Sequence, residues 1–373
     1  EALSYVWGSE YNLTPIYIKS DDGTNQHLLI TENLRIALLH LRDPLLERVL
    51  WIDAICINQH DDQEKSHQVQ SMANIYASAS RVTVWLGEAG DDSDKALEML
   101  RNAAEQQIGS SADTEKKQHQ AVLALLRRPW FQRIWVLQEV AAARHTVIKC
   151  GLSEIDGYAF YLGLNALQLT YDAEFQGLIP SISYLLQGTV FRLRRQLNSV
   201  GKFSLGIRPL AELIDMYHTR KTTDPRDKVY ALLGMCSDDP SSAGLVADYG
   251  PETTFDKVFQ KVVEFSLSSQ ILVRNISVMH QAVALIQGKA RILGHVSSRY
   301  QNSGSTSRDI VISGNQSCLG IEYQKSAMTI LATVKDITEG DILCLLAGAT
   351  KPSLIRPCIG YWELLAMAVP IPD

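Results

Sequence analysis

The 373-residue sequence lacks the features that mark several large classes of protein. Lysine and arginine number 35 against 41 aspartates and glutamates, which gives a net charge of −6. This balance argues against a nucleic-acid-binding protein, because such proteins normally carry a basic stripe. No apolar run is long enough to span a bilayer and no secretory signal is present, so we expect no membrane span and a cytoplasmic location.

Motifs for metals and common cofactors are also missing. The six cysteines are scattered without a C-x-x-C pair, which is typical of reduced thiols, and no zinc-type spacing occurs. No G-x-G-x-x-G motif and no P-loop is found, so neither a dinucleotide-binding fold of that kind nor an ATPase is predicted. We therefore expect no metal site and no resident cofactor. The hydrophobic content of 46% nevertheless predicts a folded globular chain.

The most informative segment is 50–59, Leu-Trp-Ile-Asp-Ala-Ile-Cys-Ile-Asn-Gln. An apolar, isoleucine-rich run that ends in polar residues predicts a buried strand followed by a helix. In open α/β sheets, ligands bind at the carboxyl ends of such strands. Asp53, Asn58 and Gln59 are therefore candidate ligand-binding residues. The alternatives are a structural hydrogen-bonding role for Asp53, which we favour, and turn formation by Asn58 and Gln59.

Strand and helix patterns alternate over the first 150 residues, which predicts a parallel sheet flanked by helices. The expected strands are 2–7, 49–57, 81–86 and 146–150, with a hairpin around 21–23, and the expected helices are 34–41, one that begins after Asp61, 91–126 with a break near 110, and 129–141. We expect an α/β domain at 1–152.

The rest of the chain divides into two further parts. Residues 153–285 are predicted to form a mainly helical region packed on the first domain, with a helix at 224–234 that Asp224 caps and Pro225 opens. Residues 286–373 are predicted to form a small β-rich region. It should include a hairpin of strands 330–334 and 342–346.

Several motifs of the first 150 residues occur in the order seen in one known family. They are Ala-Leu-Ser-Tyr-Val-Trp-Gly at 2–8, Trp-Ile-Asp-Ala-Ile-Cys-Ile-Asn-Gln at 51–59, Val-Trp-Leu-Gly at 84–87, Arg-Pro-Trp-Phe at 128–131 and Arg-Ile-Trp-Val-Leu-Gln-Glu at 133–139. Together they closely resemble the fungal heterokaryon-incompatibility (HET) domain. The resemblance implies a role in fungal non-self recognition and programmed cell death.

HET domains in turn resemble TIR domains, which have a flavodoxin-like parallel sheet and some of which hydrolyse NAD. Leu3-Ser4-Tyr5 is similar to the end of the first TIR strand. Glu139 lies four residues after Trp135, as does the catalytic glutamate of hydrolytic TIR enzymes. The resemblance implies a TIR/flavodoxin-like fold, a catalytic Glu139 and NAD as substrate. Insertions after Gly8 and at 91–127 depart from the TIR pattern.

Other residues join Glu139 in the predicted site. Tyr5, Trp7 and Gly8 follow the first strand, where an aromatic ring could stack on a nucleotide base and Gly8 would allow close backbone approach. Trp135 belongs to the same substrate-binding set, and ordinary core packing is the alternative for the aromatic residues. Cys56 is expected to be a buried, inert thiol.

For Glu139, the alternative is a polar helix residue paired with Arg133 or Arg144. The residue pattern alone favours that alternative, and the TIR-like spacing makes the catalytic role an equal hypothesis. In that role the carboxylate would lie near a ribose and stabilise an oxocarbenium-like transition state.

Three functions remain open. The first is an NAD glycohydrolase that releases nicotinamide and an ADP-ribose product. The second is a non-catalytic signalling module that self-associates into a homo-oligomer. The third is a specialised enzyme acting on a small fungal metabolite. The expected partners are accordingly a nucleotide or another small molecule, and no nucleic acid.

Overall fold

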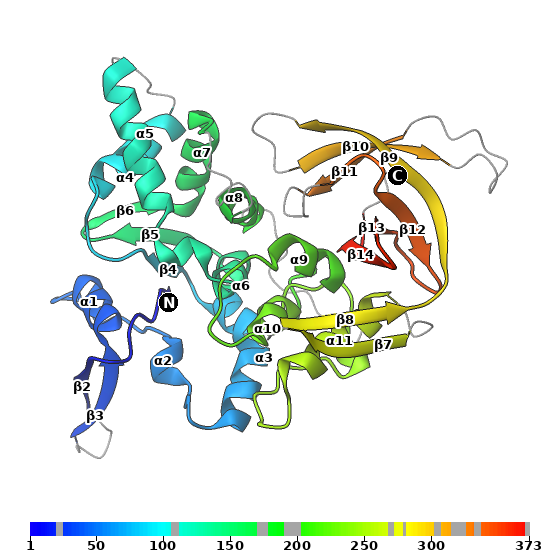
Figure 1. Cartoon of the computed structure of the whole chain (residues 1–373). Helices are drawn as coiled ribbons and strands as arrows, with labels where there is room; N and C mark the ends of the chain where they lie inside the picture. Colours follow the sequence, from blue (N-terminus) through cyan, green and yellow to red (C-terminus); the bar gives the residue numbers. More distant parts are fainter. Residues whose placement is uncertain are drawn as a thin grey trace. The chain divides into compact units, whose positions relative to one another are not determined.

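The computed structural model describes residues 1–19, 25–105, 112–169, 178–189, 203–267, 272–278, 281–301, 307–314, 326–331 and 337–369. The chain forms two compact units, Glu1–Arg195 (unit 1) and Gln196–Asp373 (unit 2). In Figure 1 unit 1 runs from blue to green and unit 2 from green to red.

Unit 1 is built around a four-stranded sheet with the order β1-β4-β5-β6. β1, β4 and β5 are parallel, and β6 pairs antiparallel with β5. The strands are β1 (Ala2–Ser4), β4 (Val82–Trp85), β5 (Thr146–Cys150) and β6 (Ser153–Asp156). Every residue of β1 and β4 is buried, as expected for parallel strands with both faces covered. The predicted parallel sheet is confirmed.

At β1 the connections of the chain lead to neighbours on opposite sides of the strand. Trp51 forms a single parallel bridge to Ala2, on the opposite side of β1 from β4. With Trp51 counted as the second position, the spatial order is 2-1-3-4, which is the start of the flavodoxin-like order. Ligands of such sheets bind beyond the carboxyl ends of the strands that flank the switch point. In unit 1 these are the ends of β1 and β4.

Helices cover both faces of the sheet. α4 (Ser93–Ala104), α5 (Ala112–Leu126) and α7 (Gly157–Leu167) lie above β4–β6 in Figure 1, and α3 (Asp62–Ser78) and α6 (Trp135–Ala142) lie below. α8 (Leu178–Thr189) contacts α6 and α7. The parallel strands are therefore shielded from water, which allows them to be almost entirely apolar.

The predicted start of α3 is confirmed. The Asp61 carboxylate accepts hydrogen bonds from the backbone N–H groups of Gln63 (2.9 Å) and Glu64 (3.0 Å). These bonds satisfy donors that the first helical turn leaves unpaired. Glu64 does not complete a capping box with Asp61, because its carboxylate accepts from the backbone N–H of Asn58 at 3.0 Å.

The predicted strand at 49–57 is wrong. Only Trp51 bridges to β1, and the chain then turns into a short helix, α2 (Asp53–Cys56). The Ile52 carbonyl accepts from the N–H groups of Ile55 and Cys56, so the backbone bonds locally instead of in a sheet. The buried isoleucines suggested a strand because a short buried helix and a buried strand have the same apolar composition.

The predicted hairpin and first helix are confirmed. β2 (Leu13–Lys19) pairs antiparallel with β3 (Asn25–Thr31), although the turn at 21–23 lies outside the described residues. Thr31 caps α1 (Glu32–Leu41), whose buried face joins Leu3, Tyr5 and Trp85 in one hydrophobic cluster. α1 therefore covers the same face of the sheet onto which Leu3 and Tyr5 project.

Unit 2 contains helices followed by antiparallel sheets. Its six-stranded sheet has the order β11-β10-β9-β12-β13-β14. Its helices are α9 (Leu210–Tyr217), α10 (Asp227–Leu233), the 3-10 helix η2 (Pro240–Ala243) and α11 (Phe255–Leu267). Its strands are β7 (Leu272–Val278), β8 (Gln281–Gln287), β9 (Ala290–Gln301), β10 (Ser307–Gly314), β11 (Ser326–Leu331), β12 (Ile342–Leu346), β13 (Ser353–Cys358) and β14 (Tyr361–Ala366). The predicted C-terminal β region is confirmed.

The predicted hairpin of 330–334 with 342–346 is wrong. β11 pairs with β10, whereas β12 lies between β9 and β13. The turn before β12 explains this choice, because the buried Asp341 carboxylate binds the guanidinium of Arg356 on β13 at 2.7 Å. The Asp341 carbonyl also accepts from Val296 of β9. Long-range contacts thus select the neighbours of β12.

Element boundaries differ from expectation at two other places. The strands of unit 2 begin at Leu272, inside the segment 153–285 that was predicted to be mainly helical. α10 begins at Asp227 after a turn at 225–226, in which the Asp224 carboxylate accepts from the backbone N–H of Arg226. Unit 1 extends past 152 through α7 and α8, and the division into 1–152, 153–285 and 286–373 stays a prediction. Among the described residues, no helix is long and apolar enough to cross a membrane.

The contact between α4 and α7 leads to a stability prediction. A Cβ atom on Gly163 would lie 2.2 Å from the carbonyl oxygen of Leu100. We expect Gly163→Ala to lower the free energy of unfolding by about 1–3 kcal/mol, because overpacking forces the helices apart. Asn165→Ala on the exposed face should change it by less than about 0.5 kcal/mol. Urea denaturation measures both, and equal effects would contradict the close contact.

Candidate functional site

The candidate site lies where β1 ends, and it begins with a buried chain of hydrogen bonds. Ser4 projects to the face opposite Leu3 and Tyr5, and its hydroxyl donates to Oε2 of Glu139. The Trp130 indole N–H donates to the Ser4 oxygen at 2.8 Å. Because the indole can only donate, the Ser4 hydrogen remains available for the carboxylate. Both hydrogen bonds of Trp130–Ser4–Glu139 are therefore donated in the same direction, toward Glu139.

A break in the predicted helix 129–141 creates this arrangement. The segment forms a 3-10 helix, η1 (Pro129–Gln132), and then α6, with Arg133 extended between them. Pro129 takes an early position in η1, where its missing N–H has no cost. The interruption lets the Arg133 side chain donate to the carbonyl oxygen of Tyr5. Trp130 and Glu139, on separate helices, both reach Ser4.

Asp53 forms the second half of the site. Its Oδ2 accepts from the indole N–H of Trp7 at 2.8 Å, and its Oδ1 from the backbone N–H of Ala54 at 2.7 Å. The Gln59 side-chain amide donates to the Asp53 carbonyl at 3.3 Å. The carboxylate thus bonds the backbone at the start of α2 and fixes Trp7 beside it. This geometry satisfies the hydrogen-bonding role favoured for Asp53.

Burial raises the pKa of both carboxyl groups. Glu139 is 1% exposed, and loss of water raises its pKa to about 7, although Arg133 and the Ser4 hydrogen bond act in the opposite direction. Burial also raises the pKa of Asp53, against the effects of Arg133 and Trp7. The negative charge of Asp53 contributes to the raised pKa of Glu139. A carboxyl group with a pKa near neutrality can exchange a proton at physiological pH.

The other predicted site residues differ in how far they are buried. Tyr5 is 2% exposed, whereas Trp7 and Trp135 are half-buried. Gly8 is exposed with φ +82°, a conformation that glycine adopts readily, and a Cβ there would lie 3.2 Å from Asn33 Cβ. Asn58 is exposed and its side chain accepts from the backbone N–H of His60, which is turn chemistry.

Residues far apart in the sequence thus meet at the end of β1. Tyr5, Trp7, Asp53, Gln59 and Glu139 are connected by hydrogen bonds or by electrostatic effects on one another's pKa. Asn58 lies in the loop that leads to α3 instead.

Sequence reasoning missed two members of the site. Ser4 and Trp130 were noticed only as parts of motifs, yet Ser4 donates to Glu139 and Trp130 donates to Ser4. Arg133 was considered as a partner of Glu139, and its side chain donates to the carbonyl oxygen of Tyr5 instead. Ser4 and Trp130 are separated by 126 residues, so no local spacing could relate them. The alternative pairing of Glu139 with Arg144 is wrong, because the Arg144 side chain donates to the carbonyl of Ala77. Cys56 was expected to be buried and is exposed.

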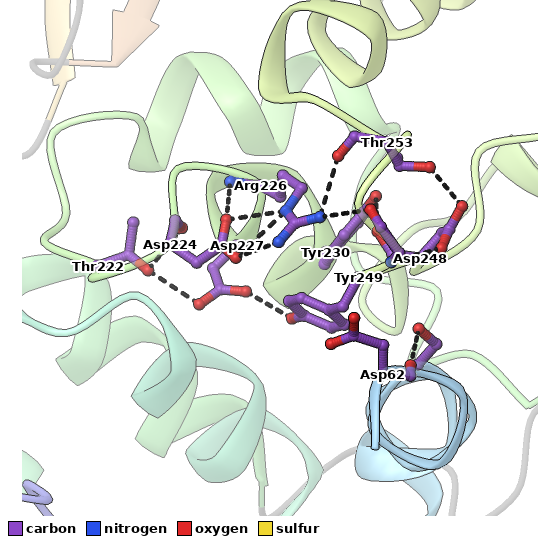
Figure 2. Close-up of polar contacts among 11 residues, drawn as sticks. Asp62, Thr222, Asp224, Arg226, Asp227, Tyr230, Asp248, Tyr249 and Thr253 are labelled. Carbon is purple, nitrogen blue, oxygen red and sulfur yellow. Dashed lines mark hydrogen bonds and ion pairs between the residues drawn. The ribbon is translucent and has the colours of Figure 1, made fainter. Parts of the chain in front are cut away.

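A second polar cluster lies in unit 2 and has a structural character (Figure 2). Arg226 binds the Asp224 carboxylate at 2.7 Å and donates to the carbonyls of Gly250 and Thr253. Asp227 accepts from the hydroxyl of Tyr249 at 2.5 Å. These bonds join the start of α10 to the segment before α11.

No metal site is formed by the described residues. They contain no group of three or more histidine, cysteine, aspartate or glutamate side chains placed to hold a metal ion. Their five cysteines are free, and Cys318 lies outside the described residues.

The fold and the site define a parallel α/β domain with a buried acidic centre at the end of its first strand. Residues 1–139 match the family model described as "Heterokaryon incompatibility protein (HET)", so the chain carries a HET domain. It is 29% identical, over 312 residues, to "Heterokaryon incompatibility protein 6, OR allele" of Neurospora crassa. The alignment covers 69% of this chain and 46% of that relative, so the chain spans about half the relative's length. No solved structure matches the chain.

The hydrogen bond from Ser4 predicts how Glu139 titrates. Ser4→Ala removes a donor that favours the ionised carboxylate, so the pKa of Glu139 should rise by about one pH unit, as expected for a hydrogen bond to a charged group. NMR titration of the carbon-13-labelled glutamate carboxyl groups measures this change. Ser153→Ala, on exposed β6, is the control and should leave the Glu139 titration in place. An unchanged titration in Ser4→Ala would contradict the bond.

The raised pKa of Glu139 also predicts how stability depends on pH. In the folded chain the carboxyl binds its proton up to pH about 7, whereas a free glutamate loses it near 4.5. The stability from this group is therefore complete below pH 4.5 and is lost as pH rises through 7. Glu139→Gln should remove that loss. At pH 8 its free energy of unfolding should exceed that of wild type by on the order of 3 kcal/mol.

Urea unfolding from pH 5 to pH 8 measures the pH dependence of stability. Asp215 in unit 2 provides the comparison. Its half-buried carboxylate accepts from the backbone N–H groups of Met367 and Ala368, and loss of water raises its pKa to about 7. Asp215→Asn should leave in place the part of the pH dependence of stability that is due to Glu139. If Glu139→Gln has the same pH slope as wild type, the raised pKa is refuted.

Proposed function

We propose that this chain acts in heterokaryon incompatibility, the recognition of non-self between fungal cells. The support is the HET match over residues 1–139 and the similarity to heterokaryon incompatibility protein 6 of Neurospora crassa. Fungal programmed cell death is the expected outcome of such recognition, as the HET resemblance implies.

In finer terms, we propose that the HET domain hydrolyses NAD, with Glu139 as the catalytic residue. The observation that carries this proposal is the position of Glu139, a buried carboxyl group with a pKa of about 7 beside the carboxyl end of β1. Ligands of sheets with this strand order bind at that edge. A carboxyl group of this kind is uncommon on an ordinary amphipathic helix, because carboxylates are almost never fully buried without a partner.

The proposed reaction breaks the bond between the nicotinamide nitrogen and C1′ of the ribose. The bonding electrons leave with nicotinamide, and an oxocarbenium-like ribose forms that the ionised Glu139 stabilises. A water molecule adds to C1′ and loses a proton, which gives nicotinamide, ADP-ribose and H⁺. Ser4 would hold the carboxylate as an acceptor during this step, since Trp130 keeps the Ser4 hydrogen directed at it.

The remaining predicted residues would bind the substrate. Tyr5, Trp7 and Trp135 offer aromatic rings to a nicotinamide or adenine ring. Gly8 is exposed after β1 and Gln59 is half-buried beside Asp53, where backbone and amide groups could hold polar groups of the nucleotide. Asn58, exposed in the loop that leads to α3, would have to reach the nucleotide from there. Asp53 would support Trp7 through its hydrogen bond.

Burial of Glu139 supports a second candidate function. With 1% of its surface exposed, this carboxylate is closed to substrate unless the domain opens. A non-catalytic module that signals by self-association needs no such opening, and the Trp130–Ser4–Glu139 chain would then hold β1 to α6. The two candidates predict different outcomes for the same protein sample.

Incubation of the purified protein with NAD distinguishes them. On the enzymatic proposal, chromatography should detect nicotinamide and ADP-ribose in equal amounts. Glu139→Gln should lower the rate at least about 100-fold, because it removes a charge that stabilises the transition state. Glu98→Gln on the exposed face of α4 is the matched control and should keep the full rate.

Two results would contradict the enzymatic proposal. Full activity of Glu139→Gln would refute the role of Glu139. No nicotinamide release from a sample that light scattering shows to be assembled would refute NAD hydrolysis and favour the self-associating module.

A further inference from the structure

β14 is the last strand of the six-stranded sheet in unit 2, and no described strand pairs with its outer edge. Backbone N–H and C=O groups on such an edge are open to pairing with another chain, so proteins usually protect it. β6, at the edge of the sheet in unit 1, is protected in this way. The Arg101 guanidinium donates to the carbonyl of Glu154 at 2.6 Å, and Lys149 forms an ion pair with the carboxylate of Glu154. Charged side chains thus occupy the free edge of β6.

The outer half of β14 carries aromatic residues instead. Tyr361 is 61% exposed and Trp362 is 56% exposed, and no proline, lysine or arginine lies between Tyr361 and Ala366. Glu363 is the one charged residue of the strand, and it is half-buried across the ladder from Arg356. The usual protection by lysine or proline is therefore missing from this edge.

The pairing of β14 with β13 determines which backbone groups point outward. Cys358 and Tyr361 flank a two-residue turn, and the next pair is Pro357 with Trp362. Proline has no N–H, and hydrogen-bonded pairs alternate with non-hydrogen-bonded pairs, so Pro357 and Trp362 form a non-hydrogen-bonded pair. The N–H and C=O of Trp362 therefore point away from β13, as do those of Leu364. In the described part of the chain, no other backbone group bonds to either residue.

The sequence of this edge suits a second copy of the same strand. In an antiparallel pair centred on Trp362, the two Trp362 residues exchange both backbone hydrogen bonds. Their indoles then lie side by side on one face, and aromatic neighbours stabilise strand pairs. On the other face, Tyr361 lies opposite Glu363 of the second copy. A pair centred on Glu363 would instead place two carboxylates directly opposite, which is destabilising. Charge thus favours the register centred on Trp362 over that one.

We propose that the outer edge of β14 binds the same edge of a second copy of this chain, by antiparallel pairing centred on Trp362. The two six-stranded sheets then form one continuous sheet across a two-fold axis. The contact lies outside residues 1–139, which match the HET family, and it goes beyond the proposed function.

The size of the contact determines how strongly the copies bind. Two half-exposed aromatic residues and the strand backbone bury on the order of 400 Å² per copy. A standard interface between proteins buries about 800 Å² per partner. The dimer should therefore be weak and reversible, with a dissociation constant on the order of 100 µM.

Sedimentation velocity of the purified chain tests the proposal, at concentrations from about 5 µM to about 500 µM. The chain should sediment as a monomer at the lowest concentration and mainly as a dimer at the highest. Hydrogen exchange measured by mass spectrometry locates the contact. The segment 361–366 should exchange at least about twofold more slowly at the highest concentration, because its outward amides become bonded. This measurement needs no variant.

Variants identify the residue at the centre of the contact. Trp362→Pro removes the outward N–H and the indole but no hydrogen bond to β13, so this variant should fold and remain a monomer. Trp362→Phe keeps the N–H and an aromatic ring and should still dimerise. Leu45→Ser is the matched control, because it removes an apolar side chain of unit 1 that is 90% exposed, and it should dimerise like wild type. Circular dichroism verifies that each variant is folded.

Two results would overturn the proposal. If the wild-type chain remains a monomer at every concentration, the edge of β14 is open to a strand of a different protein instead. If the dimer survives in Trp362→Pro, the contact lies elsewhere in the chain. Glu139→Gln should dimerise like wild type, so the outcome for NAD hydrolysis does not decide the outcome for this contact.

Discussion

The hydroxyl of Ser4 is the contact on which the first unit depends. It accepts from Trp130 and donates to Glu139, so it joins β1 to two separate helices in the interior of the domain. Without this hydroxyl, an indole N–H and a carboxylate would both be buried with fewer partners, and each unmet group costs about 1–3 kcal/mol. The hydrogen bonds of Ser4 therefore form only when β1, η1 and α6 are correctly positioned relative to one another. This requirement explains why a short strand of three residues has a well-defined environment on both faces.

The architecture of unit 1 could be predicted because it follows from local patterns. Apolar runs marked β4 and β5, Asp61 marked the start of α3, and the alternation of strands and helices predicted a parallel sheet. Segment 50–59 could not be assigned in this way, since its isoleucines fit a buried helix as well as a strand. The strands next to β12 could not be predicted from local sequence patterns either, because the contact of Asp341 with Arg356 selects them. For the site, motif spacing identified Glu139, but its hydrogen bond from Ser4, and the bond from Trp130 to Ser4, arise only in the folded chain.

Burial has two opposite effects on Glu139. Exclusion of water raises its pKa toward neutrality, which suits acid–base or electrostatic chemistry. The same exclusion keeps substrate away. Glu139 can therefore meet a molecule from solvent only when β1, Arg133 or Trp7 moves. Hydrogen bonds at the Tyr5 carbonyl and at Asp53 are the contacts that any opening must change.

The position of β1 in the chain has a consequence for biosynthesis. The strand that lies between Trp51 and β4 is made before its partners, and Glu139, which accepts from its Ser4 hydroxyl, follows 135 residues later. During translation the Ser4 hydroxyl must therefore wait for Glu139, although the backbone of β1 can pair earlier with Trp51 and β4. Contacts between residues this far apart slow folding, and exposed strand edges promote aggregation in the interval. A chaperone that shields β1 during synthesis would act on residues that are all buried in the folded domain.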